Sequence, residues 1–233
     1  RALEANLDAL QYAEKEGGRS LVDMDNLPRT LADVPVPYIP GVDTSTKEGQ
    51  EFAKRVLMLR TIVNSDENDG NKEIIWGVFM QGDNGNRQWI NFAPWPKRIL
   101  QYNGNQWIDG WCAISPTLYS AEHFYTKNGK LPEKDSEFTS AKLSDRQEVI
   151  KLNVNREPRF YANLSFDGDD YSPIMCNGSP LRINLRDANQ QGYNHDLFYR
   201  DYTVTGYICK KYTAPEILIS SAGKDNRKNY AKP

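Results

Sequence analysis

The stretch "DGWCAISPTLYSAEHFYTKNGKLPEKD", residues 109–135, carries a helix together with signals for its start and its end. Ser115 is of the residue type that caps helix N-termini, and Pro116 suits a first turn, where its missing N–H is not needed. Asn128-Gly129 supplies a stop. The apolar face consists of Leu118, Phe124 and Tyr125. We therefore expect a helix that starts at Ser115 and ends before Gly129.

Two further helices are predicted on the N-terminal side. "RALEANLDALQYAEKEGG", residues 1–18, places Leu3, Leu7 and Leu10 on one helical face. A second helix follows a connector that contains four prolines. Ser45 and Glu48 fit a capping box for it, and Phe52, Val56, Leu59 and Val63 recur at helical spacing. Since neither Met nor a cap precedes the first helix, we expect the native chain to be longer.

Short strands are predicted on both sides of the central helix. The stretches 72–79, 159–166 and 202–212 are rich in β-branched and aromatic residues. A long polar loop separates the last two, and the tail after Ser220 is charged. These elements indicate an α+β fold, mainly α-helical, with long loops and short strands.

Composition argues against several classes of partner. The net charge is −2 and no basic stripe occurs, so a nucleic-acid partner is not expected. The mean hydropathy of −0.71 indicates a polar, loop-rich protein. Cys112, Cys176 and Cys209 have no metal-binding spacing, and we interpret them as small buried apolar residues. Their pairing is left open.

Catalytic and metal motifs are weak. Asp167, Asp169 and Asp170 in "FDGDDY" are the residue type a glycoside hydrolase needs, but this sequence is also typical of a turn. We expect a solvated loop with no second carboxylate across a cleft, and no catalysis. No cofactor is expected. A calcium ion is left open at "NSDENDGNKE", residues 64–73, although Asp69 stands where an EF-hand has glycine.

Tryptophans mark the candidate binding segment, residues 89–111, which holds four of the chain's five. Aliphatic neighbours predict that Trp76 and Trp111 are mostly buried. Amides, prolines and glycines surround Trp89, Trp95 and Trp107, and we predict that at least two of these three are exposed. A flat indole stacks on the C–H face of a sugar ring, while amides and guanidinium groups bind its hydroxyls. The hydrogen-bonding candidates are Arg87, Asn91 and Asn105. Core packing is the alternative for these indoles.

Several segments resemble one family in the correct order, over roughly residues 70–216. They are "NKEIIWGV" (71–78), the stretch 109–135, "NREPRFYANLSFDGD" (155–169) and "YTVTGYICKKYTAPE" (202–216). The set is similar to the SusD/RagB family of Bacteroidetes outer-membrane lipoproteins, with Glu157 in place of the usual aspartate.

The resemblance implies a fold and a role. It implies a tetratricopeptide-like helical scaffold, here residues 1–66, joined to a loop-rich SusD/RagB region, residues 67–233, as one structural unit truncated at both ends. The implied role is non-catalytic capture of oligosaccharides for import through a SusC-like TonB-dependent transporter. The implied location is the cell surface, on the outer membrane, through a lipid anchor. Oligopeptide binding, as in the RagB branch, and glycoside hydrolysis are the alternatives.

Overall fold

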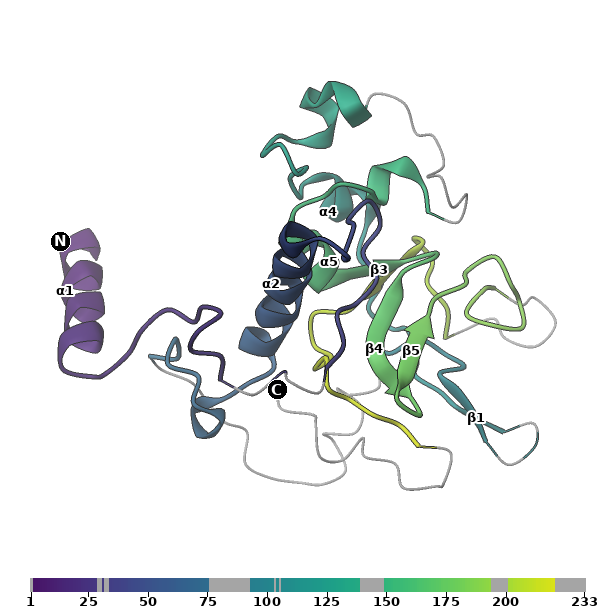
Figure 1. Cartoon of the computed structure of the whole chain (residues 1–233), viewed down its shortest axis with the longest axis horizontal. Coiled ribbons are helices and arrows are strands. Elements are labelled where there is room, and N and C mark those ends of the chain that lie inside the picture. Colours follow the sequence, from purple (N-terminus) through teal and green to yellow (C-terminus); the bar gives the residue numbers. More distant parts are fainter. Residues whose placement is uncertain are drawn as a thin grey trace.

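The computed structural model describes residues 2–28, 31, 34–75, 93–102, 104, 106–138, 149–193 and 201–220. Within these ranges the fold combines helices with short antiparallel strand pairs, which is the predicted α+β class (Figure 1). The α-helices are α1 (Ala2–Lys15), α2 (Lys47–Val63), α4 (Leu118–Glu122) and α5 (Pro158–Asn163). The 3₁₀ helices are η1 (Glu67–Asp69), η2 (Pro132–Lys134), η3 (Ser136–Phe138) and η4 (Lys151–Asn153).

In the described part of the chain, the strands form three two-stranded antiparallel sheets. β1 (Leu100–Tyr102) pairs with β2 (Gln106–Ile108), and β4 (Asp170–Cys176) pairs with β5 (Ser179–Arg182). β3 (Leu164–Phe166) pairs with the distant β6 (Tyr207–Cys209). The predicted strand 202–212 is thus limited to β6. Residues 72–75 of the predicted strand 72–79 form no strand, and its remainder lies outside the described residues.

The N-cap of helix α2 lies one residue later than predicted. Thr46, not Ser45, accepts a hydrogen bond from the Gly49 amide at 3.1 Å. A Cβ on Gly49 would lie 1.9 Å from the Asp43 carbonyl oxygen, so this turn requires glycine. The buried face of α2 packs against α5 in the centre of the molecule (Figure 1).

Helix α1 stands apart from α2 at the edge of the molecule (Figure 1). Its sequence predicts an apolar face, and the helix is present. Leu3, Leu7 and Leu10 of that face are nevertheless exposed.

Two predictions around the central helix are wrong in detail. The cap of α4 is Thr117, whose hydroxyl accepts from the Ser120 amide, and not Ser115. The helix ends at Glu122 because the guanidinium of Arg156 takes the carbonyls that would continue it, including those of Ala121 and Phe124 at 2.6 and 2.7 Å.

The predicted strand 159–166 is also wrong over its first half. Pro158 occupies the first turn of a helix, and its residues 159–163 continue α5. The strand β3 starts only at Leu164. The side chains of α5 explain the change, because Phe160 and Tyr161 are both buried against neighbouring rings.

Two apolar cores hold these elements together. One lies between α2, α5 and β3, and the other lies under the β4–β5 pair. The first contains Ile39, Ala53, Val56, Ala121, Val149, Phe160, Tyr161, Ala162, Leu164, Phe166 and Tyr207. The second contains Trp95, Ile99, Ile108, Cys112, Tyr171, Met175, Leu181, Ile183, Ile208, Ala214, Ile217 and Ile219.

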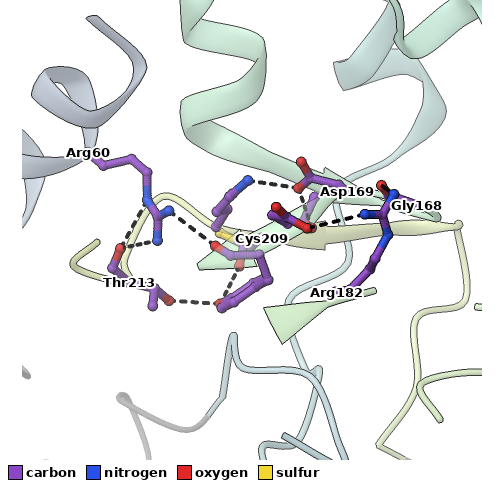
Figure 2. A network of polar contacts seen from close by, with 10 residues as sticks. Arg60, Gly168, Asp169, Arg182, Cys209 and Thr213 are labelled. Carbon is purple, nitrogen blue, oxygen red and sulfur yellow. Dashed lines mark hydrogen bonds and ion pairs between the residues drawn. The ribbon is translucent and has the colours of Figure 1, made fainter. Parts of the chain in front are cut away.

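A buried polar network joins the two cores (Figure 2). Arg60 of α2 donates to the Thr213 carbonyl at 2.7 Å and to the Tyr171 carbonyl at 3.1 Å. Burial lowers the pKa of Arg60 to about 10, so it remains charged at neutral pH. Asp169 accepts from Lys210 at 2.7 Å. The network therefore fixes the turn before β4 against α2 and the segment after β6.

Candidate functional site

The tryptophan segment does not form the predicted array of exposed indoles among the described residues. Trp95 is 2% exposed and belongs to the core under β4–β5, so for this side chain the alternative, core packing, holds. Trp107 lies on β2 and is half-buried. Trp111 is also half-buried. The predicted site residues Arg87, Trp89, Asn91 and Asn105, together with Trp76, lie outside the described residues.

Local backbone packing explains why Trp95 turns inward. The Cys112 amide donates to the Trp95 carbonyl at 2.8 Å, and the Gly110 amide donates to the Pro96 carbonyl at 2.9 Å. A Cβ on Gly110 would lie 2.4 Å from the Trp95 Cβ. The two chain segments thus lie too close for any residue but glycine at position 110, and the Trp95 indole is buried in the core under β4–β5.

The three aspartates of "FDGDDY" have three different environments. Asp169 is fully buried in the pair with Lys210, and it also accepts from the Ser165 hydroxyl at 2.6 Å. Asp170 is buried and lies 4.0 Å from Arg182. Only Asp167 faces a cavity.

This cavity is a polar pocket of about 540 Å³, within the size range of small-ligand sites. We call it the β5 pocket, because it opens between the turn after β3, the end of β5 and the loop 184–192. Its lining is Asp167, Gly168, Arg182, Ile183, Asn184, Arg186, Asp187 and Gln190. The expectation of no second carboxylate beside Asp167 is wrong, since Asp187 also lines this pocket.

The far wall of the pocket is a loop that is held together by hydrogen bonds between its own residues. The Asn184 amide donates to the Gln191 side chain at 3.0 Å, and the Gly192 amide donates to the Asp187 carbonyl at 3.0 Å. A Cβ on Gly192 would lie 2.6 Å from the same carbonyl oxygen. Asp187 in turn accepts from the Asn189 amide at 2.8 Å. The wall is therefore ordered before any ligand enters.

Two of the four charged side chains that line the pocket, Arg186 and Asp167, form an ion pair. Arg186 Nε lies 2.6 Å from Asp167 Oδ2, and the other oxygen of Asp167 accepts from the Leu185 amide at 2.8 Å. Arg182 donates to the Gly168 carbonyl at 3.3 Å, as Figure 2 shows, and its guanidinium lies 5.2 Å from the centre of the Tyr38 ring. Both arginine side chains are exposed, at 42% for Arg182 and 57% for Arg186.

An aromatic pair follows the pocket loop directly. The Tyr193 and Tyr202 ring centroids are 4.6 Å apart, and the rings are tilted by 56°. Tyr193 is 51% exposed and comes three residues after Gln190 of the pocket lining. An exposed ring beside hydrogen-bonding groups is the combination predicted for the tryptophans.

The tryptophan segment supports the pocket from behind. Gln191 is buried, and its side-chain amide donates to the Arg98 carbonyl at 3.2 Å. The Arg98 guanidinium donates to the Ala188 carbonyl at 2.7 Å. Residues just before β1 therefore fix the loop that forms the pocket wall.

Residues 64–73, where the sequence leaves a calcium ion open, contain a capped turn. Asp66 and Asp69 each accept from the other's backbone amide, which forms a capping box around η1. Across the described ranges, no group of three or more His, Cys, Asp or Glu residues is placed to hold a metal ion. His123 stacks on Tyr119, with ring centroids 3.9 Å apart.

Sequence reasoning missed the β5 pocket, although the signal is present. "LRINLRDANQQGY", residues 181–193, is rich in Arg, Asp, Asn and Gln, and it ends in tyrosine. This is the same mixture of polar groups and an aromatic ring that drew attention to the tryptophans. What the sequence lacks is any sign that Asp167 and Arg182 meet at this loop.

The chain is similar to known proteins both in sequence and in structure. The sequence profile described as the SusD family matches residues 72–232. No curated protein matches the chain. The solved structure of BT4246 is similar, with a TM-score of 0.85 and 42% sequence identity, over 100% of this chain and 38% of BT4246.

A second solved structure is a SusD-like protein, BF3747, from Bacteroides fragilis NCTC 9343. It has a TM-score of 0.47 and 21% identity, over 70% of this chain and 29% of that protein. The chain thus spans less than half the length of both structures. No helix in the described ranges is long and apolar enough to cross a membrane.

Proposed function

The chain belongs to the SusD family, and from this premise we propose that it captures oligosaccharides at the cell surface without chemically changing them. Members of this family are in general non-catalytic proteins that bind carbohydrate. The observation that carries the proposal to a particular site is the β5 pocket, with the exposed Tyr193 ring beside its wall.

The pocket has the groups that a sugar requires. Carboxylate oxygens of Asp167 and Asp187 accept hydrogen bonds from hydroxyls, while Arg182 and Arg186 donate to them. Sugar hydroxyls are strongly hydrated, so these bonds largely replace bonds to water and contribute little net affinity. The apolar contact must come from a ring face, and Tyr193 offers one.

The tryptophan segment forms a second part of the proposal. Trp107 is half-buried on β2, so one part of its indole is open to a ligand. We propose that Trp107 and Trp89, with Arg87, Asn91 and Asn105, edge the sugar-binding surface. Trp95 has no place in it because its ring is covered.

The carboxylates of the pocket support binding rather than hydrolysis. A glycoside hydrolase needs one carboxylic acid to donate a proton and a second carboxylate as base or nucleophile. Here both oxygens of Asp167 are engaged, one by Arg186 and the other by the Leu185 amide. Asp187 accepts from the Asn189 amide. Both carboxylates thus accept hydrogen bonds from groups that hold them in place, as binding residues do.

The remaining steps concern the whole protein. We propose a lipid anchor on the outer membrane and transfer of the captured glycan to a SusC-like TonB-dependent transporter. These features rest on the family resemblance. Co-purification with a TonB-dependent transporter from detergent-solubilised membranes would test the partner.

Affinity electrophoresis across plant, host and fungal polysaccharides tests the binding. The glycan that retards the protein is then titrated calorimetrically with Tyr193→Ala and Tyr193→Phe. Loss of a stacked ring should weaken binding by about 1–3 kcal/mol, by analogy with base stacking, and Phe should retain part of the affinity. Tyr119→Ala, an exposed tyrosine on α4, is the matched control.

The alternatives give different results in the same experiments. If a peptide library retains the protein and no glycan does, the alternative of oligopeptide binding would be favoured. Release of reducing sugar from a retarding polysaccharide would indicate hydrolysis. Equal affinities for the parent and for Tyr193→Ala would exclude Tyr193 from the site.

A further inference from the structure

The charges that line the β5 pocket cancel. Two lining residues are acidic, Asp167 and Asp187, and two are basic, Arg182 and Arg186. Each arginine already lies beside a carboxylate, since Arg186 is 2.6 Å from Asp167 and Arg182 is 4.0 Å from Asp170. Asp170 itself is buried and does not line the pocket.

Among the described residues that line this pocket, an anionic ligand finds no cation that lacks a neighbouring carboxylate. A uronate or sulfate group would have to compete with Asp167 for Arg186 and with Asp170 for Arg182. It would also lie close to the carboxylate of Asp187, whose single hydrogen bond to the Asn189 amide does not neutralise it. Like charges brought together in a partly desolvated site repel strongly.

A neutral sugar finds the opposite situation. A pair of neighbouring hydroxyls can donate to one carboxylate oxygen and accept from the guanidinium beside it, without disturbing the ion pair. The side chains of Asn184 and Gln190 add neutral donors and acceptors to the same lining. The pocket therefore complements hydroxyl groups along its whole wall.

From this charge balance we propose that the β5 pocket selects neutral glycans and discriminates against uronate-containing and sulfated ones. The inference rests on the proposed function, glycan capture, and specifies its ligand class. The selectivity is assigned to the paired charges of the pocket and to Asp187, whose carboxylate accepts from a backbone amide rather than from a cation.

The test compares one polysaccharide in two charge states. A neutral polysaccharide that retards the protein is used as it is and after oxidation of its primary hydroxyls to carboxylates. Its linkages are thereby unchanged. We expect the oxidised form to bind at least about tenfold more weakly at low salt, and the difference to shrink at 0.5 M NaCl because of screening.

A charge variant assigns the effect to the pocket. Asp187→Asn removes one negative charge, while its side-chain oxygen still accepts from the Asn189 amide. We expect this variant to reduce the ratio of the affinity for the neutral glycan to the affinity for the oxidised glycan by about threefold to tenfold. Asp23→Asn is the matched control, because Asp23 likewise accepts from the amide two residues later, in an exposed turn elsewhere. It should leave the ratio unchanged.

The outcomes separate this inference from the function on which it rests. Equal or tighter binding of the oxidised glycan would overturn the selectivity and leave glycan capture intact. An equal change of the ratio in Asp187→Asn and Asp23→Asn would show that the β5 pocket is not its source. Absence of binding to any glycan, neutral or charged, would overturn the proposed function and the inference together.

Discussion

The buried pair of Asp169 and Lys210 gives the sharpest test of how this fold is held together. Both side chains are almost fully covered, at 1% and 3% residue exposure, and Lys210 Nζ lies 2.7 Å from Asp169 Oδ2. Asp169 precedes β4, and Lys210 follows β6. The pair therefore joins two segments that are distant in the sequence, next to the turn that forms one wall of the β5 pocket.

Burial dominates the energetics of this pair. It raises the pKa of Asp169 and lowers the pKa of Lys210, because desolvation penalises both charged forms more than their attraction favours them. The loss of a single partner leaves the other charge buried and uncompensated. We therefore expect Asp169→Asn and Lys210→Met each to lower the free energy of unfolding by roughly 3–5 kcal/mol.

The double variant distinguishes an ion pair from two independent contacts. With both charges gone, neither member of the pair is left as a buried charge without the other, so the double variant should be more stable than the sum of the single losses predicts. We expect a coupling energy of at least about 1.5 kcal/mol. Urea unfolding followed by tryptophan fluorescence measures all four proteins. Losses that add within about 0.5 kcal/mol would refute the reasoning, because the two side chains would then act separately.

Further predictions follow from the surroundings of individual side chains. Arg156→Lys should lower the free energy of unfolding by roughly 2–5 kcal/mol, because one ammonium cannot replace the guanidinium that donates to four carbonyls, and thermal melting measures the loss. Trp95→Ala should cost about 3–5 kcal/mol of stability, whereas Trp107→Ala should mainly lower glycan affinity, as urea unfolding and calorimetry would show. Burial raises the pKa of Cys112 from 9.0 to about 12 and that of Cys176 to about 11, so both thiols should resist alkylation at pH 8 until the protein is unfolded. Since the folded pKa values are the higher ones, this contribution to stability is complete below pH 9 and is lost as the pH rises towards 12, which unfolding measured against pH would reveal.

Helix positions could be predicted well where the signal is local. The spacing of apolar residues in α2 and the glycines after α1 are visible in the sequence, and both helices are present. Boundaries were less accurate, because adjacent hydroxyl residues compete for one capping role. At α2 the choice between Ser45 and Thr46 depends on which oxygen reaches the Gly49 amide.

Long-range contacts explain the larger errors. Residues 159–163 have the composition of a strand, but Pro158 fixes a helical first turn and the rings of α5 find a core to fill. Trp95 has the neighbours of a surface residue, yet Gly110, fifteen positions later, lets the two backbones approach closely, and the indole lies in the core. No property of either short segment reports the presence of its distant partner.

The same reasoning explains why the tryptophan segment, residues 89–111, contacts the wall of the β5 pocket. The indole of Trp95 anchors its segment in the core, and this anchoring fixes the backbone two and three residues further along. There the Lys97 and Arg98 carbonyls receive the side-chain amide of Gln191, and the Arg98 guanidinium reaches the Ala188 carbonyl. These contacts hold the wall of the β5 pocket, which lies more than eighty positions away in the sequence. A tryptophan surrounded by turn-forming residues can therefore help to order the wall of a candidate pocket without its ring lining that pocket.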